Sequence, residues 1–200
     1  MGVMAKGSVI VNGVRFEDTT ANISIDDTPK TAADLRDGMV VRVVGTVNTD
    51  GITGTAQRVE AQIEVRGTPT SVNPAASPQS LVVLGQTVFA DDQTIYSNLA
   101  GFGDITTSTL IEVHGLRDTS GRIRATRIEA NTAQMGDNTV DEIRGVVSGG
   151  AGTNPTTFSL GTQAVNASAA GIAPAGARYQ EGRGVEEHRG GRPCTPVGGF

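Results

Sequence analysis

The feature that most constrains this chain is an internal repeat. Residues 8–16 (SVIVNGVRF) recur at 80–88 (SLVVLGQTV). Further on and in the same order, three later segments also recur: Asp34-Leu35 at Asp104-Ile105, 40–45 (VVRVVG) at 110–115 (LIEVHG), and 56–61 (AQRVEA) at 125–130 (ATRIEA). A repeat of this length indicates one supersecondary unit used more than once, so the chain must be read unit by unit.

A weaker third copy begins at 143–147 (IRGVV), which echoes 65–67 (VRG). It continues through 158–161 (FSLG), aligned with 82–85 (VVLG), and deteriorates after Gly176. Residues 184–190 (GVEEHRG) place charges where the first two copies have apolar positions. We therefore predict a first unit over 1–64, a second over 65–132, a partial third over 133–177 and a disordered tail over 178–200.

Local patterns within each copy predict strands. Asn12-Gly13 lies between two apolar runs, which is a strong signal for a two-residue hairpin turn. That turn would pair Val11 with Val14 and Val9 with Phe16 on one face of the hairpin. Residues 39–47 and 53–63 read as a second hairpin around the turn 48–51, and 118–121 repeats that turn before 122–129. The Pro-containing stretch 74–78 reads as a loop inside the second unit.

Composition decides how such strands can close on themselves. The chain has 27 glycines, 4% aromatic and 37% apolar residues, which favours a turn-rich β protein with small cores. A short unit of about five or six strands hides its edges best by curling. We predict an all-β fold of tandem, small, OB-like antiparallel β-barrels with a degenerate third repeat; Gly13, Gly45, Gly85 and Gly115 suit the sharp bends.

Charge and residue usage exclude several functions. A net charge of -5 with almost no aromatic residues argues against nucleic-acid binding. Two histidines and a single cysteine, Cys194, are too few for a structural zinc site, which takes about four such ligands. No phosphate-binding glycine motif opens a helix, and no apolar stretch is long enough for a transmembrane helix. We expect no cofactor and no metal.

The repeated segments carry a family resemblance. Residues 7–16 (GSVIVNGVRF), 34–45 (DLRDGMVVRVVG) and 51–56 (GITGTA) resemble a bacterial domain-of-unknown-function family catalogued under number 5666. The likeness covers 2–130 and, loosely, 143–176. It implies tandem small β-barrels, commonly behind a signal or lipoprotein leader, and hence a periplasmic or cell-surface location. It implies no activity, cofactor or catalytic residue, and the first residues of this sequence lack a leader pattern.

Candidate sites are few. His114 stands where the first copy has Val44, so we expect a packed or rim histidine; His188 falls in the predicted tail. Asp26-Asp27 and Asp91-Asp92 could attract calcium, but they lack EF-hand spacing and fall at expected turns. We expect a solvated strand face, not an oligonucleotide surface, from a basic stretch in the second unit, consisting of Arg117, Arg122, Arg124 and Arg127.

These observations favour a non-enzymatic structural or protein-interaction module of the bacterial cell envelope. Its partner would be another protein or a second copy, bound through exposed strand edges. The alternative is a small-ligand or oligosaccharide-binding barrel with a pocket flanked by Phe89, Tyr96 or Phe102. An enzyme is not expected, because no convergent set of titratable residues can be assembled from the sequence.

Overall fold

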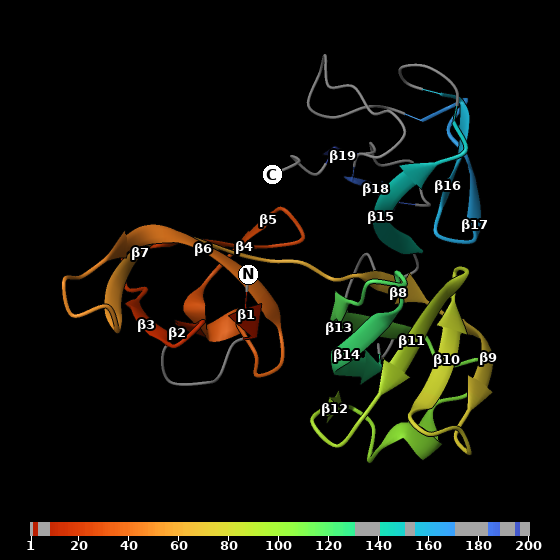
Figure 1. Ribbon diagram of the computed structural model, residues 1–200, viewed down its shortest axis with the longest axis horizontal. Coiled ribbons are helices and arrows are strands. Elements are labelled where there is room, and N and C mark those ends of the chain that lie inside the picture. Colours follow the sequence, from red (N-terminus) through yellow and green to blue (C-terminus); the bar gives the residue numbers. More distant parts are fainter. Residues whose placement is uncertain are drawn as a thin grey trace.

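The computed structural model describes residues 2–3, 9–130, 141–150, 155–170, 184–188 and 195–196, with the backbone alone for 2–3, 184–188 and 195–196. These residues form strands and two short 3-10 helices, with no α-helix among them. The prediction of an all-β fold is confirmed. In Figure 1 the first unit lies on the left, the second at the lower right and the third above the second.

The first unit is a 7-stranded sheet in the order β1-β6-β7-β3-β2, with β4 on β7 and β5 on β4. Its hairpin pairs Val11 with Val14 and Val9 with Phe16, as the Asn12-Gly13 turn predicts. Both turn residues have positive φ, which Asn and Gly tolerate best. The elements are β1 (Gly2–Val3), β2 (Val9–Val11), β3 (Val14–Glu17), β4 (Asn22–Ile25), β5 (Thr28–Lys30), η1 (Ala32–Asp34), β6 (Val40–Val47) and β7 (Thr53–Ala61).

The second unit repeats this pattern within a 12-stranded sheet. Strand for strand, β10 and β11 take the place of β2 and β3, β12 that of β4, and β13 and β14 that of β6 and β7. Residues 74–78 join two paired strands, so they form a loop inside this unit. The elements are β8 (Val65–Gly67), β9 (Pro69–Asn73), β10 (Gln79–Val83), β11 (Gln86–Ala90), β12 (Ile95–Ser97), η2 (Phe102–Asp104), β13 (Ile111–Arg117) and β14 (Ile123–Ala130).

Repeated glycines mark a repeated irregularity. The long hairpin of each unit shifts register at one point, between Val44 and Gly45 in the first and between His114 and Gly115 in the second. A Cβ on Gly45 would lie 2.1 Å from the Thr55 carbonyl oxygen, and a Cβ on Gly115 would lie 2.5 Å from that of Arg124. These bulges therefore require glycine, because the partner strand approaches too closely for any side chain.

The third unit continues the second sheet with β15 (Glu142–Ser148), β16 (Thr157–Leu160), β17 (Gln163–Asn166), β18 (Gly184–His188) and β19 (Thr195–Pro196). Its hairpin pairs Leu160 with Gln163, the position that Val83 and Gln86 hold in the second unit. The sequence alignment of 158–161 with 82–85 is thus wrong by one residue. Phe158 and Leu160 point inward like Leu81 and Val83, and strand alternation fixes that register.

Part of the predicted tail carries strands. Backbone pairing joins β18 to β15, with Val185 opposite Gly145, and joins β19 to β18. These two segments differ from the expected disorder, because the backbone of β15 offers them a hydrogen-bonding edge that sequence charge does not reveal. The rest of 178–200, with Cys194 and Tyr179, lies outside the described residues.

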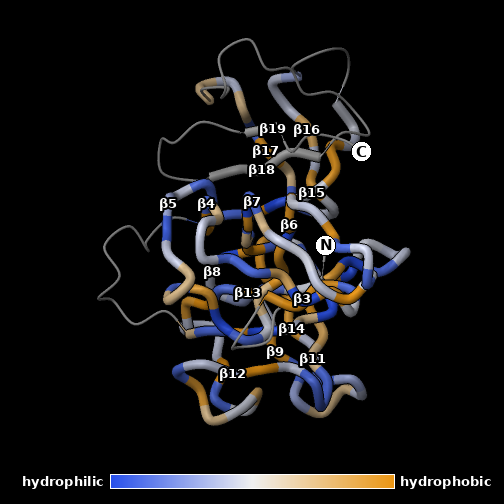
Figure 2. Tube along the Cα trace, turned by 90° about the vertical axis from the view of Figure 1, so that its left-hand side faces the viewer, coloured by the Kyte–Doolittle hydropathy of each residue, from blue (hydrophilic) through white to orange (hydrophobic). Residues whose placement is uncertain are grey.

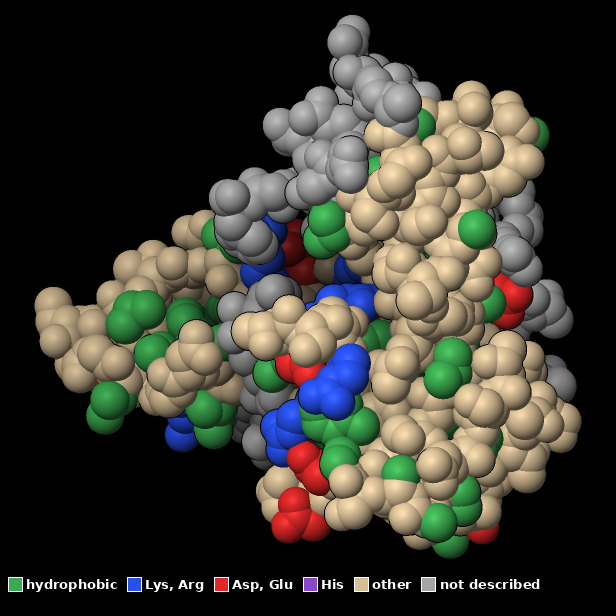
Figure 3. All heavy atoms as spheres, turned by 45° about the vertical axis from the view of Figure 1, so that its right-hand side comes forward, with side chains coloured by type: hydrophobic (Ala, Val, Ile, Leu, Met, Phe, Trp, Pro, Cys, Tyr) green, Lys and Arg blue, Asp and Glu red, His purple; other side chains and the backbone are tan. Residues whose placement is uncertain are grey.

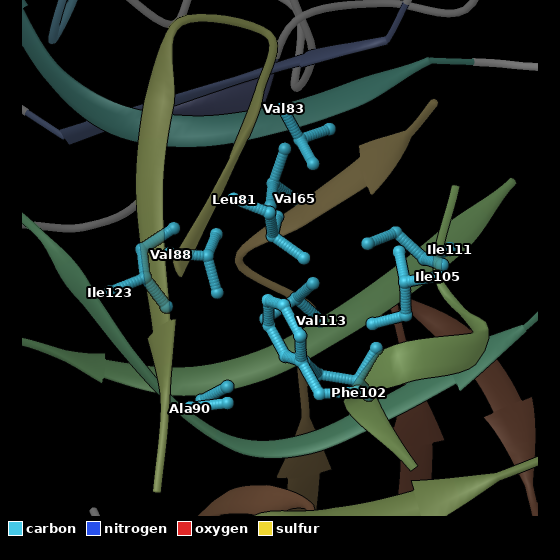
Figure 4. Packing of buried hydrophobic residues seen from close by; sticks show 12 residues of the cluster. Val65, Leu81, Val83, Val88, Ala90, Phe102, Ile105, Ile111, Val113 and Ile123 are labelled. Carbon is cyan, nitrogen blue, oxygen red and sulfur yellow. The ribbon is translucent and has the colours of Figure 1, made fainter. Parts of the chain in front are cut away.

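Each unit has its own small core. The largest is that of the second unit, built around Leu81, Val88, Phe102, Ile111 and Ile128 (Figure 4). Hydrophobic positions concentrate along the strands at the centre of the molecule (Figure 2). The alternation of buried and exposed residues, as in Gln86–Ala90, is that of strands with one face on a core and one outside. Small separate cores explain how a chain with few apolar residues folds.

Candidate functional site

The second unit carries an open cavity of about 540 Å³. It lies where the loop 74–78 meets the end of β11 and the start of β12. Its lining combines apolar and acidic groups: Ala76, Ser77, Pro78, Gln79, Ala90, Asp91, Asp92, Tyr96 and Phe102. A concave surface with a few converging polar groups is the usual form of a small-ligand site.

The structure brings together two of the three aromatic residues suggested by sequence. Tyr96 is half-buried and lines the cavity. Phe102 also lines it, but this side chain is only 3% exposed and packs in the core, which leaves little of its ring for a ligand. Phe89 is not among the lining residues: its ring lies 5.2 Å from the Arg122 guanidinium carbon, a cation–π contact. Tyr96 is therefore the main aromatic surface that the cavity offers.

The acidic side of the cavity is fixed by an ion pair. Arg124 Nε donates to Asp91 Oδ2 at 2.7 Å, and this bond holds the pKa of Asp91 below its usual range. Burial raises the pKa of the Tyr96 phenol, and the nearby Asp91 charge adds to the rise. Near neutral pH the cavity thus presents an ionised carboxylate and a protonated phenol, which together accept and donate hydrogen bonds.

The first unit has other chemistry at the same positions. Ile23 pairs with Val59 as Tyr96 pairs with Ile128, so Ile23 occupies the place of Tyr96. Ala32 begins η1 where Phe102 begins η2. The two units share a backbone and an acidic residue that opens this turn, Asp18 and Asp91, but of these two units only the second has the aromatic lining.

A second candidate is the joint between the second and third units. Strand β8 pairs with β13 on one edge and with β15 on the other, which places Val65 opposite Ile143 and Arg66 opposite Glu142. Arg66 Nη1 lies 3.1 Å from Glu142 Oε2, and Arg66 Nε lies 2.9 Å from Glu112 Oε1. The Glu142 side chain is 2% exposed. Buried charges of this kind are tolerated only when they are paired.

This joint has approximate two-fold symmetry. Residues 64–67 (EVRG) and 142–145 (EIRG) hold the same place in their units and pair antiparallel, with Val65 opposite Ile143. Arg66 faces Glu142 on one side of that pair, and the Arg144 amide donates to the Glu64 carbonyl on the other. Two equivalent surfaces therefore contact each other, as in an isologous dimer interface.

Side chains of the second unit extend this joint. Arg117 donates to Glu64 Oε2 and Gln86 Oε1, each at 2.9 Å, and to the Arg144 carbonyl. Gln86 Nε2 donates to the Leu160 carbonyl at 2.7 Å. The turn of β10–β11 meets the turn of β16–β17 where Thr162 Oγ1 donates to the Gly85 carbonyl. The face of the second unit that is covered by the third unit therefore combines these polar groups with the apolar side chain of Leu84.

The first and second units meet through loop 36–39. Thr126 Oγ1 donates to the Gly38 carbonyl at 2.6 Å, and Arg127 Nη1 donates to the Asp37 carbonyl at 3.2 Å. The expected solvated basic face is thus wrong for Arg127 and Arg117. Arg127 is buried between units and Arg117 joins the third unit, whereas Arg122 and Arg124 remain partly exposed.

His114 is packed, as its repeat position predicts. It is 2% exposed, and Nδ1 lies 3.1 Å from the Gln62 carbonyl, so the neutral ring carries its proton on Nδ1. Burial lowers the pKa of His114 to about 4, and the charges of Arg127, Arg144 and Arg66 contribute. The neutral imidazole of His114 can therefore pack in the interior without burying a charge.

Neither acidic pair forms a cation site with its neighbours. Asp26 and Asp27 occupy a turn; Asp26 Oδ1 accepts from the Ile63 amide at 2.9 Å and Asp26 Oδ2 lies 3.8 Å from Arg66. Across the described ranges, no group of three or more His, Cys, Asp or Glu side chains could hold a metal ion. Within the same residues, no helix is long and apolar enough to cross a membrane.

Fold and site together define a class of protein: an all-β chain of tandem repeat units with an open cavity in the second unit and buried polar contacts between units. The chain belongs to the family described as a domain of unknown function (DUF5666), which matches residues 2–60 and 66–129. Those segments coincide with the first two units. No curated protein and no solved structure matches the chain.

Proposed function

We propose that this chain is a non-enzymatic protein-interaction module, in which each of the first two units is a small β-barrel that binds other β-structure at its edges. The observation that carries the proposal is strand β8. It already pairs with β13, yet it also takes up β15 of another unit on its opposite edge. Strand addition of this kind is a common mode of protein recognition.

Two features support the barrel form. Strands β8 and β9 follow each other in the chain with only Thr68 between them. They pair with β13 and β10, which lie toward opposite ends of the strand path of the second unit. A path whose two ends belong to one continuous segment closes on itself, and closure is the usual solution for a small sheet.

Open edges give such a module its binding sites. Among the described residues, β5 pairs only with β4, and β17 pairs only with β16. The residues of β5 are all exposed. The non-enzymatic part of the proposal is supported by Asp91, whose lowered pKa suits a fixed carboxylate better than proton transfer near neutral pH.

Site-specific photo-crosslinking in the source cell tests the proposal. A crosslinking amino acid at Thr28 on the β5 edge, or at Asn166 on the β17 edge, should give discrete products with one defined protein. The same amino acid at Thr107, in an exposed turn of the second unit, serves as the control. Only free monomer from both edge positions would contradict an interaction role. Fractionation of the same cells tests a periplasmic or cell-surface location, which we propose from the family resemblance.

The cavity supports a second candidate, an oligosaccharide-binding module. Tyr96 offers an aromatic surface and Asp91 an ionised acceptor, which suit a sugar ring and its hydroxyls. Oligosaccharide titration followed by NMR should shift signals of residues around 76–79 and 91–96. Tyr96→Ala should abolish the shifts, and Ile23→Ala, at the same position of the first unit, should not change them. Unperturbed spectra with every sugar tried would exclude this candidate.

A further inference from the structure

The joint between the second and third units shows which face of a unit is built to receive another. On the second unit this face consists of the turn Leu84-Gly85 with Gln86 and Arg117 beside it. Leu84 packs against the cores of both units, and Gln86, Gly85 and Arg117 each bond to the third unit. The second and third units are repeats of each other, and they meet here through equivalent turns, that of β10–β11 and that of β16–β17.

The first unit has the same face, composed of different residues. Strand register places Asn12-Gly13 at the position of Leu84-Gly85, and Val14 at that of Gln86. The repeat likewise places Val47 at the position of Arg117, and Ile52 lies in the turn beside it. We call these residues, Asn12, Gly13, Val14, Val47 and Ile52, the turn face of the first unit.

Beside the exposed Asn12-Gly13 turn, the turn face presents apolar side chains to solvent. Ile52 is 64% exposed and Val47 is 48% exposed, and the Ile52 carbonyl accepts from the amide of Arg15, next to Val14. Hydrophobic side chains gather on the left-hand lobe in Figure 3, which is the first unit. Within the described residues, no strand pairs with the outer edge of β6 from Val43 to Val47. Exposed aliphatic side chains beside an open strand edge mark an interaction site.

We propose that the turn face of the first unit binds the turn face of a second copy of this chain, related by a two-fold axis. This inference rests on the proposed interaction function and names the partner. Repeat units of this chain already associate in a two-fold manner, with β8 paired to β15 and the Gly85 turn against the Thr162 turn.

The apolar side chains of the turn face favour a second copy of that face as its partner, rather than the third unit of another chain. The third unit presents the backbone carbonyls of Leu160 and Arg144, which match Gln86 and Arg117 of the second unit. Val14 and Val47 offer no donors for those groups, so docking there would leave carbonyls without hydrogen bonds. An apolar face is best covered by its own copy, because in a two-fold interface each apolar side chain meets apolar surface.

Sedimentation velocity and light scattering on the whole chain, over a range of micromolar concentrations, test the proposal. We expect a concentration-dependent dimer with twice the 20.5 kDa mass of the chain. Ile52→Lys and, independently, Val47→Lys should raise the dimer dissociation constant by about tenfold or more, because each buries a charge in the interface. Val146→Lys is the matched control: Val146 is 55% exposed but lies on β15, outside the turn face. Thermal melting checks that each variant is folded.

Cysteine crosslinking tests the geometry. In a Cys194→Ser background, Asn12→Cys should form a disulfide-linked dimer, because the two-fold axis brings the two turns together. Thr119→Cys, exposed on the second unit, should not. A chain that is monomeric throughout, or a dimer that tolerates both lysine variants and does not crosslink at position 12, would overturn the inference. A monomer that still gives edge crosslinks to another protein would do so while leaving the proposed function intact.

Discussion

The first and second units differ most in where they bury polar groups. In the described residues, the buried polar side chains of these two units all lie in the second: Gln86, Thr94, His114, Thr126 and Arg127. Most of them bond across a boundary, Gln86 to the third unit and Thr126 and Arg127 to the first. The two cores themselves are equally apolar. The buried polar side chains of the second unit therefore reflect its contacts with neighbouring units on both sides.

The largest effect should come from breaking the charge pair that joins the second unit to the third. Arg66→Met removes the cation that lies 3.1 Å from the buried Glu142 and 2.9 Å from Glu112, which should cost about 3–5 kcal/mol of unfolding free energy. Arg42→Met removes an exposed pair with Glu60 in the first unit and should cost less than about 1 kcal/mol. Chemical denaturation measures both. Equal losses would mean that the joint does not contribute to stability in this way.

A pH experiment sharpens the comparison at one position. The pKa of His114 is about 4 in the folded chain, against an ordinary value of 6.5. Between these pH values the imidazole is therefore protonated in the unfolded chain and neutral in the folded chain. Stability should fall between pH 6.5 and 4, by about 3 kcal/mol at most, and this contribution should vanish above pH 6.5.

His114→Val restores the residue of the first unit and should remove this part of the pH dependence, at the cost of a donor to the Gln62 carbonyl. Denaturation at a series of pH values, compared between the two proteins, isolates the histidine from the carboxylates. Parallel stability curves would show that His114 is not the titrating group.

A smaller loss of stability, similar in the first and second units, should follow from substituting the bulge glycine that both units have. Gly45→Ala and Gly115→Ala each force a methyl group against a partner-strand carbonyl and should cost about 1–3 kcal/mol. Gly103→Ala, whose Cβ would meet nothing within 4 Å, should be nearly neutral. Thermal unfolding of the three variants gives the comparison. If only one bulge were sensitive, the two long hairpins would not be equivalent.

Sequence patterns predict what is local and repeated. The Asn12-Gly13 turn sets its hairpin register because two residues suffice to determine it. The repeat indicates a packed or rim position for His114, but its full burial does not follow from it, because the equivalent Val44 is only partly buried. Of the three aromatic residues suggested by sequence, Tyr96 and Phe102 line the cavity, but periodicity does not indicate that Phe102 belongs to a core or that Phe89 lies under Arg122.

What sequence does not reveal are the contacts between units. Arg127 reads as an exposed strand residue, and only the position of loop 36–39 buries it. The register of the third hairpin depends on which of Phe158 and Ser159 points inward, a choice made by packing against Leu84. No window of the chain contains both partners of these contacts, so single-sequence patterns do not report them.

Strand β8 finally bears on the order in which the chain folds. Its two partners come later, since the Arg66 contacts to Glu112 and Glu142 span 46 and 76 residues. During synthesis from the N-terminus, β8 must wait first for β13 and then for β15. The second unit should form before the third can dock, and an arrested chain lacking the third unit would expose the edge of β8 to neighbouring nascent chains.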